Sequence, residues 1–115
     1  MSKDDRVRLR HMLDSAQEAV ELIQGKSRAD LDTNRVLSLA LVRLLEIVGE
    51  AANRVTIATR QETPDIPWSQ IVSLRHRLIH GYDTINMDIL WKILTDDLPR
   101  LIAQLERIEY PGVEK

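Results

Sequence analysis

The sequence predicts an all-α protein that folds as an up-and-down four-helix bundle. Three observations support this. Apolar residues recur at spacings of three and four in four long stretches, which is the period of a helix with a buried face. The chain has 4 Gly and 4 Pro in 115 residues, too few turn-formers for a many-stranded β protein. It has no Phe and only 3% aromatic residues, so the core must consist of Leu, Ile, Val and Ala.

The chain length predicts a single domain over residues 1–115, because domains most often contain roughly 100–150 residues. The first helix is expected over residues 4–24, with Gly25 as its C-terminal stop. Residues 26–32 are polar and are expected to form a connector.

The second helix is expected to begin near Asp32 or Thr33, either of which can cap it, and to end near Thr59. Apolar residues cover more than one stripe of this helix, so it needs partners on two sides. It is either the central helix of the bundle or a helix that also meets a second copy of the chain. Gly49 lowers helix propensity by about 1 kcal/mol relative to Ala, so we expect a packing reason for it.

The third and fourth helices are separated from the second and from each other by clear breaks. Pro64 and Pro67 interrupt the chain, and the third helix is expected from Pro67 to Gly81. Asn86 is the expected cap of the last helix, over residues 87–109. Pro99 lies inside that helix and should kink or break it.

Composition excludes several classes of protein. The net charge of -2 and the pI near 5.9 argue against a nonspecific nucleic-acid coat, although a small local basic site on RNA remains compatible with them. With no cysteine there is no disulfide, thiolate nucleophile or sulfur-bound metal, which fits a reducing cytoplasm, where we expect the protein. No run of about 18 apolar residues and no signal-peptide core is visible, so no membrane association is expected.

The candidate site is the polar cluster at the end of the third helix: Arg75, His76, Arg77, His80 and Tyr82. Histidine suits proton transfer near neutral pH, and arginine offers a fork of donors that matches phosphate oxygens. On one continuous helix, Arg75 and His80 would lie about 140° apart, which aims them poorly at one atom unless the last turn unwinds at Gly81. Two copies facing each other could instead surround a phosphate.

Each of these side chains also has a structural explanation. Arg75 could form an ordinary ion pair, and His80 could interact with the last carbonyls of the helix. Tyr82 could cover the end of the bundle, and His76 and Arg77 could simply be solvated. A zinc site is not expected, because His76 and His80 have no evident third ligand nearby and the two arginines repel a cation. No cofactor is expected.

The segment Arg75-x4-His80-x-Tyr82 resembles the R-x4-H-x-Y motif of the HEPN superfamily, specifically the HepT-like toxin ribonucleases. Four segments in the right order carry the resemblance, and together they cover most of residues 35–105. They are residues 45–54 (LEIVGEAANR), 66–68 (IPW), 78–82 (LIHGY) and 91–99 (WKILTDDLP).

The resemblance implies a HEPN-like all-α bundle that forms a homodimer or a higher even oligomer, with two motifs in one cleft. It implies metal-independent endoribonuclease activity with Arg75 and His80 as the catalytic pair, supported by His76, Arg77 and Tyr82. It also implies a toxin neutralised by an MntA-like nucleotidyltransferase antitoxin that transfers AMP to Tyr82. His76 departs from the family pattern, which has Asn or Asp directly after the arginine.

Three functions are compatible with these residues. The first is the endoribonuclease toxin with RNA as substrate. The second is a noncatalytic HEPN module that binds a nucleotide or a nucleotidyltransferase partner. The third is a dimeric helical scaffold in which the motif only supports the interface.

Overall fold

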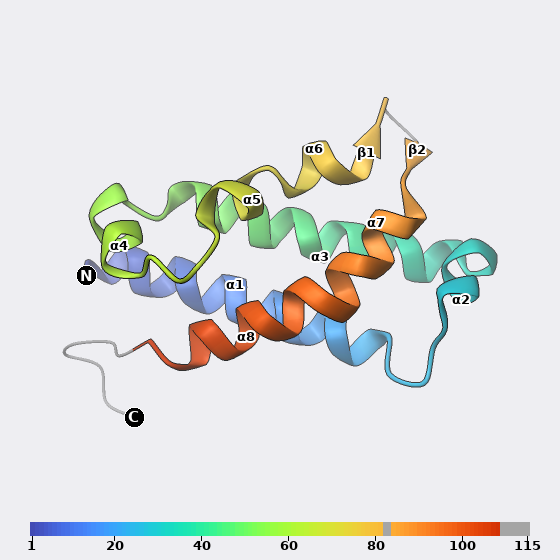
Figure 1. Ribbon diagram of the computed structural model, residues 1–115, viewed down its shortest axis with the longest axis horizontal. Helices are drawn as coiled ribbons and strands as arrows, with labels where there is room; N and C mark the ends of the chain where they lie inside the picture. Colours follow the sequence, from blue (N-terminus) through green and yellow to red (C-terminus); the bar gives the residue numbers. More distant parts are fainter. Residues whose placement is uncertain (82–83, 109–115) are drawn as a thin grey trace.

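The computed structural model describes residues 1–81 and 84–108, and it is a helical bundle of the expected all-α, HEPN-like kind. Four long segments run back and forth along the molecule (Figure 1). They are α1 (Lys3–Leu22), α3 (Arg35–Arg54), the pair α5 (Trp68–Val72) and α6 (Leu74–Leu78), and the continuous run of α7 (Met87–Lys92), η1 (Ile93–Asp97) and α8 (Leu98–Glu106).

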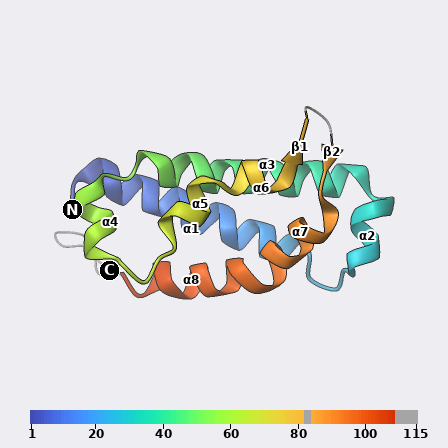
Figure 2. The same cartoon turned by 45° about the horizontal axis from the view of Figure 1, so that its top comes forward.

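The core lies mainly between α1, α3 and α8, which pack side by side (Figure 2). Leucines and other aliphatic residues fill it, as the near absence of aromatic residues predicts. Its fully buried members include Leu9, Met12, Leu41, Leu45 and Leu105. Gly25 adopts a φ of +74° just after α1, so the predicted stop is confirmed.

The polar connector at residues 26–32 is partly helical, contrary to the prediction. It contains the short helix α2 (Arg28–Thr33), which Leu31 anchors in the core. Asp32 and Thr33 belong to this helix and do not cap the next one. Asn34 caps α3 instead, because its side-chain oxygen accepts a hydrogen bond of 3.0 Å from the backbone N–H of Leu37.

The second long helix ends at Arg54, five residues before the predicted end. Val55 is extended, and Thr56 then caps a separate short helix, α4 (Ile57–Glu62). The reason is a contact from a distant part of the chain. The carboxylate of Asp5 accepts hydrogen bonds from the backbone N–H and the hydroxyl of Thr56, and these hold the turn open.

The third helix is also shorter than predicted. It consists of α5 and α6, and it ends at Leu78 instead of Gly81. The following residues form a two-stranded antiparallel hairpin that the sequence did not predict, with β1 (Ile79–His80) paired to β2 (Thr84–Ile85). Gly81 has a φ of +75°, which suits the turn out of β1. Figure 1 shows the hairpin projecting beyond the bundle.

Asn86 caps the last helix as predicted, with its side chain accepting from the backbone N–H of Ile89 at 3.0 Å. The break considered for the last helix at Pro99 is absent, because α7, η1 and α8 follow one another without interruption. The helix instead contains the π-helical turn η1, where the N–H of Leu98 donates to the carbonyl of Ile93. Pro99 then lies at the start of α8, where an N–H is not needed. Within the described residues, no helix is both long and apolar enough to cross a membrane.

Candidate active site

Helix α6 is held against α3, and this contact decides which of its side chains face outwards. Leu74 and Leu78 are buried in the core, so Arg75 and His76 lie on the outer side of α6. A close approach at Gly49 allows α5 and α6 to lie this near to α3. A Cβ atom at Gly49 would be 3.2 Å from the backbone oxygen of Ile71, which confirms the packing reason expected for this glycine.

The guanidinium of Arg75 lies beside a carboxylate of α3. The distance from Nε of Arg75 to Oε2 of Glu46 is 3.6 Å, longer than a good hydrogen bond. The Arg75 side chain is 71% exposed, and that of Glu46 is 21% exposed. The ion pair suggested for Arg75 is therefore present, but it leaves most of the guanidinium open to a ligand.

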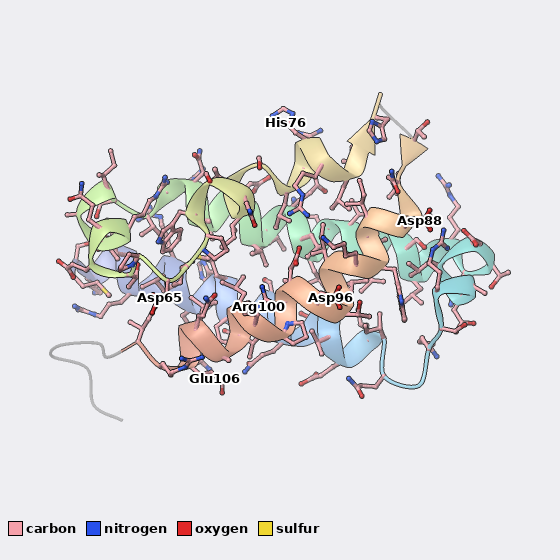
Figure 3. All side chains as sticks on the ribbon, viewed as in Figure 1. Asp65, His76, Asp88, Asp96, Arg100 and Glu106 are labelled. Carbon is pink, nitrogen blue, oxygen red and sulfur yellow. The ribbon has the colours of Figure 1, made fainter. Side chains whose placement is uncertain are left out.

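Arg75 and His76 line a hollow of about 340 Å³ between α3 and the helix pair α5–α6. The α3 side of the hollow contributes polar groups that sequence reasoning missed: Glu46, Glu50 and Asn53. These three residues are spaced by four and three positions, which places them on one face of α3. This spacing is the feature of the sequence from which a polar face could have been predicted. Figure 3 shows His76 projecting away from the bundle.

Arg77 points to a different side of the molecule. Its Nη2 atom lies 3.4 Å from Oδ2 of Asp97 in η1, and both side chains are about one third exposed. It is therefore a partly buried link between α6 and the last helical segment, not the solvated side chain suggested above. The structure separates Arg77 from the hollow that Arg75 and His76 line.

His80 is exposed on β1, and so it does not extend α6. The backbone N–H of Ile79 donates to the carbonyl of Arg75, and the helix ends there. The angle of about 140° between Arg75 and His80, expected on a continuous helix, therefore does not apply. The helix ends at Leu78, two residues before His80. Tyr82 lies outside the described residues, and so do its suggested roles as a supporting residue of the site, a cover for the end of the bundle and an AMP acceptor.

No group of three or more His, Asp or Glu side chains that could hold a metal ion occurs within residues 1–81 and 84–108. In the hollow, the Arg75 guanidinium and the His76 imidazole on α6 lie opposite the carboxylates of Glu46 and Glu50 on α3. Such a surface can offer an exposed guanidinium to a phosphate and an imidazole for proton transfer.

The all-α bundle, with an Arg-x4-His segment at the outer end of its third helical segment, defines a HEPN-like protein. More narrowly, the chain belongs to the ribonuclease HepT-like family, which matches residues 12–108.

Several curated proteins are similar to the chain along most of its length. A protein of Methanocaldococcus jannaschii named "Putative RNase" is 35% identical over 107 residues, which cover 92% of this chain and 98% of that protein. A second, of Caldanaerobacter subterraneus subsp. tengcongensis and also named "Putative RNase", is 34% identical and covers 92% and 95%. A third, named "Probable ribonuclease HepT", comes from Thermococcus cleftensis, is 32% identical and covers 84% and 91%. No solved structure matches the chain.

Proposed function

We propose that this protein is a metal-independent endoribonuclease of the HepT type. In this proposal, Arg75 and His80 form the catalytic pair in a cleft between two copies of the chain. Membership of the ribonuclease HepT-like family and the ribonuclease names of its relatives support RNA as the substrate. The single observation that carries the assignment of residues is that Arg75, on the outer side of α6, and His80, on β1 just after the early end of α6, are both exposed.

The chemistry needs no group beyond these side chains. The imidazole of His80 in one copy accepts the proton of a ribose 2′-hydroxyl while the 2′ oxygen attacks the neighbouring phosphorus. The bond from phosphorus to the 5′ oxygen breaks, and an acid donates a proton to that leaving oxygen. A second imidazole, from the other copy, can serve as this acid. The guanidinium of Arg75 stabilises the negative charge that develops on the phosphate oxygens.

Glu46 tunes this site in the free protein. Its carboxylate lies 3.6 Å from the Arg75 guanidinium and partly neutralises it, so an RNA phosphate must compete with Glu46 for the arginine. Because Arg75 is mostly exposed, the ion pair is weak and the exchange is easy.

The test is cleavage of RNA in the presence of EDTA by the purified protein and by its Arg75→Ala and His80→Ala variants. We expect each substitution to slow cleavage by about 100-fold or more, which is the usual contribution of such groups. Matched controls are available on α1. Arg10 is exposed and paired with Asp14 at 3.0 Å, and His11 is exposed, so Arg10→Ala and His11→Ala should cleave at the normal rate. Unchanged cleavage in both site variants would refute the assignment.

The proposal includes a toxin–antitoxin pair. A partner nucleotidyltransferase of the MntA type would transfer AMP from ATP to Tyr82, with the tyrosine oxygen attacking the α-phosphorus and pyrophosphate leaving. The bulky anion would then obstruct RNA beside the catalytic pair. Mass spectrometry of the protein coexpressed with the transferase should find AMP on Tyr82, and Tyr82→Phe should abolish it. Tyr110 is the only other tyrosine, so Tyr110→Phe is the matched control.

A noncatalytic HEPN module is the second candidate. The net charge of -2 and His76, which stands where the family pattern has Asn or Asp, favour it. Such a module would bind a nucleotide or a nucleotidyltransferase without cutting RNA. Binding of ATP detected by calorimetric titration, together with no RNA cleavage by the wild-type protein, would select this alternative.

A further inference from the structure

The hollow beside Arg75 has an apolar floor beneath its polar walls. Leu45 of α3 is buried and Val72 of α5 is half-buried, and both line the hollow. Its volume of about 340 Å³ is at the lower end of the range of small-molecule sites, about 300–1,000 Å³. A floor of this kind suits the face of a flat ring whose polar edge meets the walls. In RNA, the nucleobase is such a ring.

The polar groups of α3 follow one another along this hollow. Glu46 is next to Arg75, and Glu50 and Asn53 lie four and seven residues further along the helix. At 1.5 Å per residue, these steps correspond to about 6 and 10 Å along the helix axis. The end that holds the guanidinium is therefore distinct from the end that holds Glu50 and Asn53. A nucleotide has the same order of groups, with its phosphate at one end and its base at the other.

Glu50 can act as a hydrogen-bond acceptor at the far end of the hollow. Its side chain is 65% exposed. Its ion-pair partner in the described chain is Arg43, but Oε1 of Glu50 lies 3.8 Å from Nη1 of Arg43, which is too far for a good hydrogen bond. An ionised carboxylate only accepts hydrogen bonds. Glu50 therefore favours an N–H group of a ligand and disfavours a carbonyl oxygen.

Asn53 adds an amide group to the same end of the hollow. Its side chain is exposed, and no hydrogen bond among the described residues uses its amide. Its backbone carbonyl accepts a hydrogen bond of 3.0 Å from Nη2 of Arg60, which also donates to the carbonyl of Ala52 at 3.0 Å. Arg60 thus fixes the last turn of α3 and leaves the Asn53 amide available to a ligand. Unlike a carboxylate, an amide can donate as well as accept.

An acceptor beside a donor matches the pairing edge of two of the RNA bases. Adenine and cytosine carry an amino group next to an unprotonated ring nitrogen, so a carboxylate can accept from the first and an amide can donate to the second. Guanine and uracil carry a carbonyl oxygen in place of that amino group. Against Glu50, this oxygen would leave two acceptors facing each other without a proton, a contact that costs free energy.

We propose that this hollow is a base pocket, which binds an adenine or a cytosine of the RNA whose phosphate Arg75 holds. Glu50 and Asn53 are its specificity-determining residues. The carboxylate accepts from the amino group, the amide donates to the neighbouring ring nitrogen, and the ring lies on the apolar floor. The base pocket deepens the proposed ribonuclease function and rests on it, because it names the bases that the same site prefers.

The test measures binding, with the His80→Ala protein keeping the RNA intact. Short fluorescent uridine oligomers that contain one adenosine are compared with the same oligomers containing inosine, in which a carbonyl replaces the amino group of adenosine. A second matched pair has cytidine or uridine at that position. In fluorescence anisotropy, we expect the amino-bearing member of each pair to bind with a Kd at least about fivefold lower. Matched hydrogen bonds to a base edge discriminate by this factor or more.

Further substitutions in the same protein separate base preference from general RNA affinity, when the ratio of the two Kd values within each pair is followed. Glu50→Gln introduces an amide that can also donate, so the ratio should fall towards one. Arg75→Ala should weaken all oligomers alike and leave the ratio unchanged, because a phosphate contact carries no sequence information. Glu18→Gln removes an exposed carboxylate of α1 and is the matched control for the change in charge, with an unchanged ratio.

Equal binding within either pair, or preference for the carbonyl-bearing member, would overturn the base pocket, and so would a ratio that Glu50→Gln leaves unchanged. Binding and cleavage are measured separately, so the two proposals can fail independently. RNA that binds with the expected preference but is not cut by the wild type would refute the ribonuclease assignment alone. Cleavage by the wild type without any base preference in binding would refute the base pocket alone, and RNA that does not bind at all would refute both.

Discussion

At the scale of single residues, Asp5 is the one ionisable residue that is buried within the described part of the chain. Its side chain is 1% exposed, yet it accepts hydrogen bonds of 2.6 Å from the hydroxyls of both Thr56 and Thr59. Burial raises the pKa of the Asp5 carboxyl, but the hydrogen bonds from Thr56, Thr59 and Ser2 outweigh burial and lower the pKa below its ordinary value. Asp5 therefore joins the start of α1 to the turn before α4 as a carboxylate.

The lowered pKa gives a direction for pH dependence. A group with a lowered pKa in the folded state stabilises the protein above its unfolded pKa of about 3.9, and this stability is lost as the pH falls through the folded value. Asp5→Asn should lower the free energy of unfolding at pH 7 by about 1.5–3 kcal/mol, because hydrogen bonds to a charged group are lost. In denaturant titrations, the difference between variant and wild type should shrink towards pH 3.

Asp4 provides the control for that prediction. It is the exposed neighbour of Asp5 in the first turn of α1, so Asp4→Asn should change stability much less at any pH. Equal effects of the two substitutions would show that the buried network is not what stabilises this end of the bundle.

The sequence could identify the residues of the candidate site that are contiguous in the chain, but not their distant neighbours. Arg75, His76 and His80 stand out because of their composition and spacing. Glu46 meets Arg75 only because α6 packs against α3, and no local pattern encodes that contact. In the same way, Arg77 looked solvated in sequence because its partner, Asp97, lies on another element.

At the scale of elements, the existence of the helices was predictable and several of their ends were not. The apolar period locates α1, α3 and the last segment, and Asn86 and Gly25 mark their limits as expected. The period cannot show where α3 ends, because Val55 continues the apolar pattern of the helix and is buried although its backbone is extended. The hairpin was missed because Ile79 continues the apolar helical pattern and pairs with Ile85 only after the chain reverses.

The contact at Gly49 yields a prediction about helix packing. Gly49→Ala should gain about 1 kcal/mol of helix propensity. Its new Cβ atom would lie 3.2 Å from the backbone oxygen of Ile71, so α5 must shift outwards and offset most of this gain. We expect a free energy of unfolding within about 1 kcal/mol of the wild type, together with a several-fold slower RNA cleavage, because α6 carries Arg75.

Gly49→Ser extends the series with a larger side chain and should slow cleavage further. A variant with the full gain in stability and undiminished cleavage would show that α5 and α6 do not depend on this close contact. Thermal melts and cleavage rates of the same preparations are the measurements needed.

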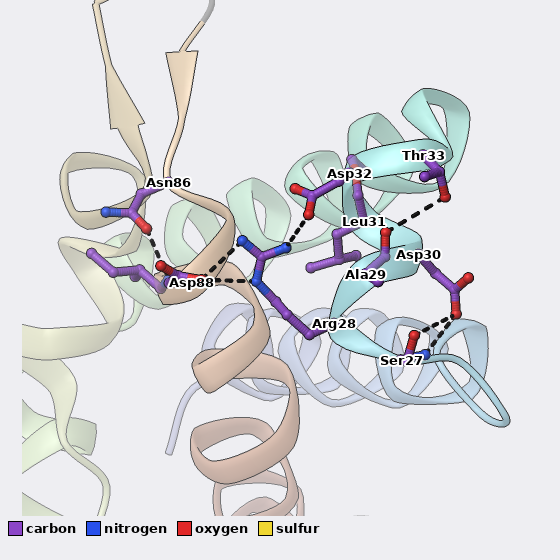
Figure 4. A network of polar contacts seen from close by, with 11 residues as sticks. Ser27, Arg28, Ala29, Asp30, Leu31, Asp32, Thr33, Asn86 and Asp88 are labelled. Carbon is purple, nitrogen blue, oxygen red and sulfur yellow. Dashed lines mark hydrogen bonds and ion pairs between the residues drawn. The ribbon is translucent and has the colours of Figure 1, made fainter.

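At the scale of the whole molecule, polar links between distant segments hold the ends of the bundle together. Figure 4 shows Arg28 of α2 between two carboxylates. It donates to Asp32 at 3.0 Å within α2 and to Asp88 of α7 at 2.9 Å. This link connects the segment after α1 to the beginning of the last helical run, close to the base of the hairpin.

Removal of this link should loosen one end of the bundle without unfolding it. In Arg28→Ala, backbone amides of α2 should exchange with solvent faster in hydrogen–deuterium exchange, and high salt should produce part of the same effect in the wild type. Arg10→Ala removes an ion pair confined to α1 and should leave exchange in α2 unchanged. Equal protection of the α2 amides in the wild type, Arg28→Ala and Arg10→Ala would mean that Leu31 alone anchors α2.

The hairpin closes on itself at its base, where the N–H of Asn86 donates to the carbonyl of Leu78 at 2.8 Å. The residues that flank segment 79–85, Leu78 and Asn86, are therefore in direct contact, so the segment could be replaced by a short turn. Replacing this segment with a two-residue turn should yield a folded protein that keeps the arginine of the motif and lacks its imidazole. Binding of RNA to this shortened protein, measured beside the wild type, would show whether binding survives the loss of the His80 imidazole.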